Sequence, residues 1–202
     1  MTAVAQPLIE EIQDALAKTS EAKYSTILSG VTDLFVNDAA LYSDEHVALF
    51  DHVMGCLIEK IDTPALVRLS ARLAPVDNAP PRTINRLAQH SDPAVCGPIF
   101  EKSVVITNEA LVDFIKTTKN PQHLSAIAGR ARIGEPIADA LVERGLADLT
   151  LKVVRNEGAK FSEFGYVKLV NRAGSNKTLA AAIAARKDVP EELRPFLTQA
   201  LA

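Results

Sequence analysis

Apolar residues recur at helical spacing along the whole chain. In the first third they form three long amphipathic segments, which begin near Pro7, Ser20 and Ser43. Their apolar positions are three or four residues apart, as on one face of a helix, and Pro and Ser are typical residues at helix N-termini. No segment alternates apolar and polar residues strictly, as a half-exposed strand would. The pattern therefore predicts an all-α protein that begins with a cap of three longer helices over residues 1–62.

From residue 63 onward the predicted helices shorten, and an apolar residue returns every 27 or 28 positions. These residues serve as anchors of a repeat: Ala79, Ile106, Ile133, Phe161 and Val189. Each anchor is followed directly by a residue suited to a helix start, and eight positions later by an apolar residue: Leu87, Phe114, Leu141, Leu169 and Leu197. The positions ten and six residues before the anchors are also apolar, except that they hold His123 and Arg155 in one repeat each.

Each repeat is predicted to be a pair of helices joined by a turn that carries the anchor. Such a pair cannot cover its own apolar face, whereas stacking on the next pair buries a continuous core. The pattern thus predicts an α-solenoid of five helix-pair repeats over residues 63–202, stacked with the cap as one continuous domain. The alternative is an ordinary helical bundle whose helices have equal lengths.

Composition supports the helical class and suggests a compartment. The 202 residues include no Trp, 5% aromatic residues and nine Gly, which disfavours a β-sandwich or a Gly-rich nucleotide fold. The two cysteines, Cys56 and Cys96, lie among apolar neighbours and are too far apart in sequence for a zinc motif. Neither a signal peptide nor a membrane-spanning segment is expected, because no apolar run approaches about 20 residues. We therefore expect a protein of the reducing cytoplasm.

The sequence predicts no catalytic residue, no cofactor and no metal ion. It contains no phosphate-binding loop and no dinucleotide fingerprint. His46 and His52 are six residues apart, which does not place them on one helical face as a metal-binding pair would be. His123 replaces an apolar residue of the repeat, and we interpret it as a half-buried histidine with a hydrogen-bond partner.

Charge is distributed unevenly along the chain. Residues 1–100 carry 7 Lys+Arg and 13 Asp+Glu, whereas residues 101–202 carry 15 and 12. Five cations fall within the three positions before an anchor, where stacking would align them into one ridge: Arg130, Arg132, Lys160, Arg186 and Lys187. A second line follows ten or eleven residues after the anchors: Lys116, Arg144 and Arg172.

Two interpretations of the ridge remain open. Cations are favoured at helix C-termini, where each helix end gains about 0.3–1 kcal/mol from the helix dipole. Alternatively, the ridge binds an anion or a partner.

Four segments together resemble a known family. They are residues 73–81 (LAPVDNAPP), 139–145 (DALVERG), 156–162 (NEGAKFS) and 186–190 (RKDVP). As a set they resemble the uncharacterised bacterial domain-of-unknown-function family 2336, a helical-repeat family, over nearly all of the chain. The architecture is more distantly similar to HEAT-like repeats. The resemblance implies a helical-repeat fold and supplies no catalytic residues.

These features favour a non-catalytic protein-interaction or scaffold module. A solenoid offers an extended binding surface, and the basic ridge suggests another protein with an acidic surface as the partner. One alternative is a nucleic-acid-binding HEAT-like protein, including the DNA-repair type. The pI near 5.8 and the absence of Trp make that partner unlikely. A small-molecule sensor between the N-terminal helices and the repeats is another alternative. The sequence predicts no oligomeric state.

Overall fold

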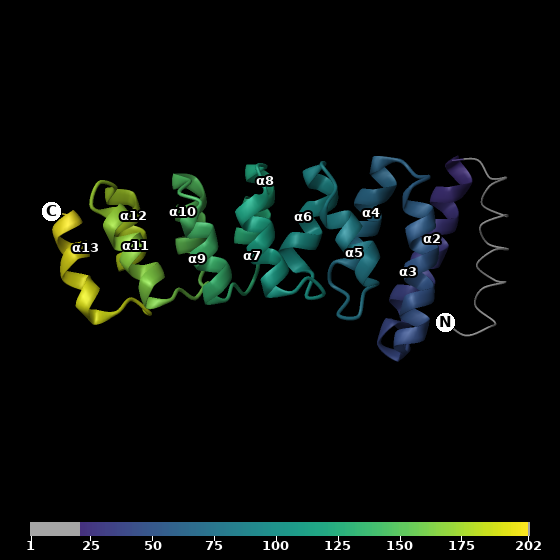
Figure 1. Ribbon diagram of the computed structural model, residues 1–202, viewed down its shortest axis with the longest axis horizontal. Coiled ribbons are helices and arrows are strands. Elements are labelled where there is room, and N and C mark those ends of the chain that lie inside the picture. The colour runs from purple at the N-terminus through teal and green to yellow at the C-terminus, as the bar shows by residue number, and fades with distance from the viewer. Residues whose placement is uncertain (1–20, 202) are drawn as a thin grey trace. The chain divides into compact units, whose positions relative to one another are not determined.

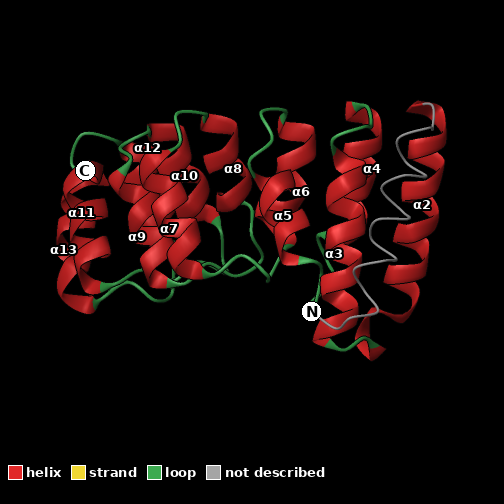
Figure 2. Ribbon diagram, turned by 45° about the vertical axis from the view of Figure 1, so that its right-hand side comes forward, coloured by secondary structure: helices red, strands yellow, loops and turns green. Residues whose placement is uncertain are grey.

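The computed structural model describes residues 21–201, and this part of the chain is built of helices (Figures 1 and 2). Between these residues there are twelve α-helices, two short 3-10 helices and no named strand. The all-α prediction is therefore confirmed. The helix expected to begin near Pro7 and the start expected at Ser20 lie outside the described residues.

The chain divides into two compact units, residues 1–106 and 107–202. The boundary predicted between cap and repeats, at residues 62 and 63, falls inside the first unit. The helices in the described part of unit 1 are α2 (Glu21–Asp38), η1 (Ala39–Leu41), α3 (Asp44–Ile58), α4 (Thr63–Leu73), α5 (Pro81–Ala88) and α6 (Pro93–Lys102). Within this unit α2 packs on α3 and α4, α3 packs on α5, and α4 and α5 both pack on α6.

Unit 2 holds the remaining helices. They are α7 (Asn108–Thr117), α8 (Pro121–Ala128), α9 (Glu135–Glu143), α10 (Ala147–Arg155), α11 (Glu163–Ala173), α12 (Lys177–Ala184), η2 (Glu191–Leu193) and α13 (Arg194–Leu201). Figure 1 shows the pairs α7/α8, α9/α10 and α11/α12 following one another in chain order. Helices α7, α9 and α11 pack in sequence and form what we call layer A, whereas α8, α10 and α12 form layer B.

Helix starts follow the predicted chemistry. Proline occupies the first turn of α4, α5, α6, α8 and α9, where its missing N–H leaves no helical hydrogen bond unmade. Side chains at the residue before several helices accept a hydrogen bond from a first-turn N–H: Asp62, Asp92, Thr107, Asn120, Ser162 and Asn176. These caps explain why the turns recur at fixed places in the repeat.

The predicted anchors form part of the core. All five are buried, the most exposed being Ile106 at 8%. Eight positions later, Leu87, Leu141, Leu169 and Leu197 are also buried, whereas Phe114 is only half-buried. The repeat was therefore predicted in the correct register on this side of the turn.

One helix departs from the predicted register. In α10 the buried apolar residues are Leu149, Val153 and Val154, whereas Leu151 is half-buried and Arg155 is exposed. The last buried residue of α10, Val154, lies seven positions before its anchor, Phe161. In the previous repeat the last buried residue of α8, Ala128, lies five positions before its anchor. Two additional residues in the turn thus shift the helix relative to the anchor.

His123 fits the interpretation given to it. The residue is buried, its Nδ1 lies 3.2 Å from the Thr118 hydroxyl, and its ring lies against Phe114. Burial lowers the pKa of His123, which favours the neutral ring. It therefore serves the core of unit 2.

Candidate functional site

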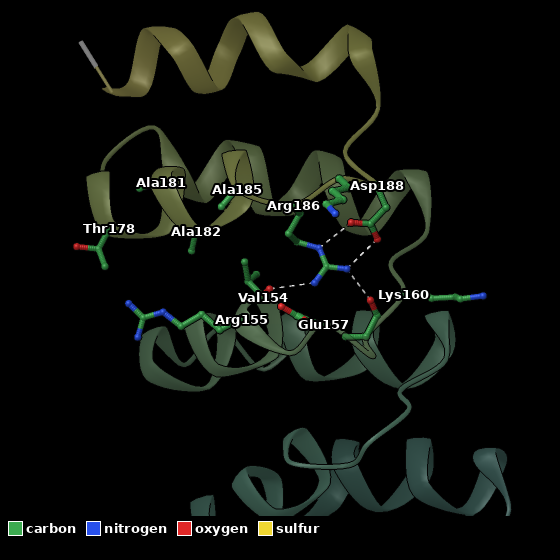
Figure 3. Close-up of a pocket in the computed structure, with 12 residues that line it drawn as sticks. Val154, Arg155, Glu157, Lys160, Thr178, Ala181, Ala182, Ala185, Arg186 and Asp188 are labelled. Carbon is green, nitrogen blue, oxygen red and sulfur yellow. Dashed lines mark hydrogen bonds and ion pairs between the residues drawn. The ribbon is translucent and has the colours of Figure 1, made fainter.

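A groove opens between α10 and α12 on the layer B side of unit 2 (Figure 3). It has a volume of about 930 Å³, compared with about 440 and 450 Å³ for two hollows between α8 and α10. Helix α12 lines it with Thr178 and three alanines, and α10 lines it with Val154 and Arg155. The turns that follow the two helices complete the walls. We call this feature the α10–α12 groove.

Arg186 stands at the centre of the groove wall and is almost completely buried, with 9% of its side chain exposed. Its guanidinium donates hydrogen bonds to three backbone carbonyls at the end of α10 and in the following turn. The acceptors are Val154 O at 3.0 Å, Asn156 O at 2.9 Å and Ala159 O at 2.6 Å. Arg186 therefore satisfies carbonyls that a helix C-terminus leaves without a partner inside the helix.

Two side chains hold the guanidinium from the other side. Arg186 forms a two-pronged ion pair with Asp188, at 2.9 and 2.7 Å, and donates to the Tyr166 hydroxyl at 3.2 Å. Burial raises the pKa of Tyr166 to about 12. Burial alone would also raise the pKa of Asp188, but hydrogen bonds with Arg186 and Tyr166 and the charge of Arg186 outweigh it and lower that pKa. The trio thus stays charged at Arg186 and Asp188 and neutral at Tyr166 near pH 7.

The five residues of the predicted ridge have different environments. Arg186 acts on a helix end, as the first interpretation of the ridge expects. Lys160 and Lys187 are exposed and line the same groove. Arg130 and Arg132 lie in the equivalent turn one repeat earlier and are not among the lining residues, and burial lowers the pKa of Arg130. The structure therefore brings three of the five together, and partner binding by the ridge stays a prediction.

Two of the three cations in the second predicted line also serve helix ends. Arg144 donates to the carbonyls of Ile115, Lys116 and Thr118, at the end of α7. Arg172 donates to the carbonyl of Val142 near the end of α9. Each cation therefore acts on the preceding helix of layer A.

Residues 95–200 match a family model described as an uncharacterised protein conserved in bacteria, DUF2336. The chain belongs to this family. The match covers α7 to α12 entirely and so includes both walls of the α10–α12 groove. No curated protein and no solved structure is significantly similar to the chain.

Within the DUF2336 region, adjacent turns are held together by backbone pairing. The N–H of Ile133 donates to Gly158 O at 3.0 Å, and the N–H of Lys160 donates to Ile133 O at 2.9 Å. A Cβ atom at Gly158 would overlap the carbonyl oxygen of Ala131, so only glycine allows this approach. The pairing fixes the turn from which the Lys160 side chain extends.

The two layers of the DUF2336 region differ in charge. Counted together with the turns that follow them, layer A helices carry six acidic and five basic residues, whereas layer B helices carry three acidic and eight basic residues. Sorting the charges by helix of the repeat would have revealed this from the sequence. The predicted ridge included only those basic residues of layer B that lie in the turns.

Arg155 is the cation of the groove that the sequence analysis did not select. The assumed register assigned it to the buried face, whereas it is exposed in the last turn of α10 and lines the groove. Within residues 23–201, Arg155, Lys160 and Lys187 form no salt bridge. The α10–α12 groove therefore has three exposed cations available to a ligand, beside one exposed carboxylate, Glu157.

Among the described residues, no group of three or more His, Cys, Asp or Glu side chains is arranged to hold a metal ion. No helix between residues 21 and 201 combines the length and apolar character needed to cross a bilayer.

Proposed function

We propose that the chain is a non-catalytic protein-interaction module that binds an acidic segment of a partner protein at the α10–α12 groove. The observation that supports it most directly is the presence of three exposed cations, Arg155, Lys160 and Lys187, around one groove. The proposal keeps Lys160 and Lys187 from the predicted ridge and adds Arg155. Arg186 supports the groove wall, since its donors are engaged within the protein.

Electrostatics would act mainly on the rate of association. An exposed ion pair contributes only about 0–1 kcal/mol, so no single contact would dominate the affinity. Several cations of one sign on layer B would instead attract an acidic segment from a distance, and added salt would weaken that attraction. We therefore expect an affinity that falls steeply as ionic strength rises.

The lining of the groove favours a peptide over a nucleic acid. Proteins that hold single strands combine a strongly basic channel with aromatic side chains that stack on bases. The residues that line the α10–α12 groove include no aromatic side chain, and the whole chain has a net charge of −3. Alanine and valine surfaces suit aliphatic or aromatic side chains of a polypeptide.

Two finer points belong to the same proposal. The stacking of helix pairs within unit 2 supports a HEAT-like α-solenoid. The free thiols of Cys56 and Cys96 support a location in the reducing cytoplasm of a bacterium.

The proposal is tested with the full chain and two labelled probes, a Glu-rich peptide and a DNA duplex. We expect the peptide to bind at low salt and to lose affinity with added salt, and the double variant Lys160→Glu/Lys187→Glu to abolish binding. The matched control is Lys102→Glu/Lys116→Glu, which changes the charge equally at exposed lysines outside the groove. Salt-sensitive DNA binding without peptide binding would favour the nucleic-acid alternative and refute the proposal.

A further inference from the structure

The groove exists because α12 carries short side chains where α10 carries long ones. Leu179 and Ile183 of α12 are buried in the way that Leu149 and Val153 of α10 are, so the two helices can be aligned. At the outward positions of this alignment, α10 has Leu151, Lys152 and Arg155. The corresponding residues of α12 are Ala181, Ala182 and Ala185. The missing side-chain volume leaves a hollow beside α10.

The floor of this hollow is apolar. Ala181, Ala182 and Ala185 line it from α12, Val154 from α10, and Ala159 from the turn that follows α10. Ala185 follows Ala181 by four residues and Ala182 by three, so the three alanines lie on the same side of α12. Ala181 and Ala185 are exposed and Ala182 is half-buried. A large apolar side chain could therefore be removed from water here.

The cations lie at different places around the groove. Figure 3 shows Arg155 and Lys160 extending to opposite sides of the view, with Arg186 and Glu157 between them, whereas the alanines of α12 lie above Arg155. Lys187 adds a third positive charge from the turn after α12. The network of Arg186, Asp188 and Tyr166 holds the two turns together, so the positions of the cations are set by buried hydrogen bonds.

We infer that the bound segment carries one bulky apolar residue flanked on both sides by acidic residues. The apolar side chain lies over Ala181, Ala182 and Ala185, one group of carboxylates reaches Arg155 beside them, and the other reaches Lys160 and Lys187 farther along the groove. This inference rests on the proposed function and adds the identity of the recognised motif. The volume of about 930 Å³ accommodates several residues of such a segment.

The test uses two labelled heptapeptides, each with three Glu on either side of a central residue that is Phe in one and Ala in the other. Anisotropy titrations with the full chain at low salt should show that the Phe peptide binds about 10- to 100-fold more tightly, as expected when a large apolar side chain is buried. The electrostatic contribution is the same for both peptides, so the difference between them reports the alanine floor alone.

Filling the groove should remove that difference. Two variants fill the groove, Ala182→Leu at a half-buried position and Ala181→Leu at an exposed one. In each of them the Phe peptide should bind no more tightly than the Ala peptide, and the Ala peptide should keep the affinity that it has for wild type. The matched control is Ala126→Leu, because Ala126 is half-buried at the equivalent position of α8 and does not line the groove. It should preserve the preference for Phe, and circular dichroism verifies that each variant is folded.

Three results would overturn the inference. Equal affinities of wild type for both peptides would reject the apolar anchor while leaving acidic binding, and thus the proposed function, in place. A preference for Phe that survives both groove-filling variants would place the apolar contact elsewhere. Failure of both peptides to bind wild type at low salt would reject the inference together with the proposed function.

Discussion

Replacing Arg186 by lysine should destabilise the protein although the positive charge is kept. The guanidinium donates to three backbone carbonyls, to Tyr166 and to both oxygens of Asp188, and 9% of the side chain is exposed. A lysine ammonium has three donors at a single point and cannot reproduce this planar fork. At least two of these hydrogen bonds would therefore be lost.

The expected loss follows from those bonds. A hydrogen bond to a charged group contributes about 1.5–3 kcal/mol, and water entering from the groove replaces part of it. We expect Arg186→Lys to lower the free energy of unfolding by about 2–4 kcal/mol. An ordinary helix-end cation would contribute only about 0.3–1 kcal/mol, even if it were removed completely.

Urea denaturation followed by far-UV circular dichroism measures the effect. The matched control is Arg132→Lys, because Arg132 belongs to the same predicted ridge but is exposed, and it should change stability by less than about 0.5 kcal/mol. If Arg186→Lys stayed within that same range, charge alone would be sufficient at this helix end, and the assignment of Arg186 to the groove wall would be refuted.

Three further predictions concern the register of α10, the close backbone approach at Gly158 and the titration of Tyr166. Leu149→Ala should cost about 2–5 kcal/mol in denaturant unfolding, and Leu151→Ala clearly less, because only Leu149 is buried; equal losses would contradict the shifted register of α10. Gly158→Ala should lower the melting temperature, whereas Gly55→Ala should stabilise the protein by about 0.5–1 kcal/mol, because a Cβ atom at Gly55 in α3 would meet no neighbouring atom. Equal changes in melting temperature for the two variants would refute the tight turn at Gly158. The absorbance at 295 nm should show Tyr166 ionising near pH 12, a step that is absent in Tyr166→Phe, and the contribution of Tyr166 to stability should be lost as pH rises from about 10 to 12. A Tyr166 step near pH 10 would refute its burial beside Arg186.

The parts of the fold that could be predicted are those set by local chemistry. Proline in the first turn and an apolar anchor at a fixed spacing each act within a few residues, so the pattern gave the helix pairs and the buried anchors such as Ile133 and Phe161 correctly. The face of α10 depends instead on how many residues the next turn contains. Assuming a constant turn length assigned Leu151 and Arg155 to the core and so concealed a cation of the groove.

The candidate site could be predicted only in part, because the same residue types serve two purposes. Arg186 and Lys187 are adjacent in sequence and both precede the anchor Val189, yet one is buried among carbonyls and the other is exposed. Helix-end preference applies to both and does not distinguish them. The difference arises from tertiary packing, since only Arg186 faces the end of α10.

A combination of the repeat with helix-end chemistry would nevertheless have predicted which cations are engaged. Arg144 reaches Ile115, 29 residues earlier, and Arg186 reaches Val154, 32 residues earlier. Asn156 likewise donates to Ala128 O, 28 residues earlier. Each donor follows one helix and satisfies the end of the helix that precedes it in the same layer, so its reach is about one repeat. Equivalent helices of successive repeats run in the same direction, so their C-termini lie on the same side of the stack. A long planar donor placed just after one helix can therefore reach the C-terminus of the preceding helix in the same layer. Such residues stabilise the interface between repeats, which leaves the cations that point outward, such as Lys160, for recognition.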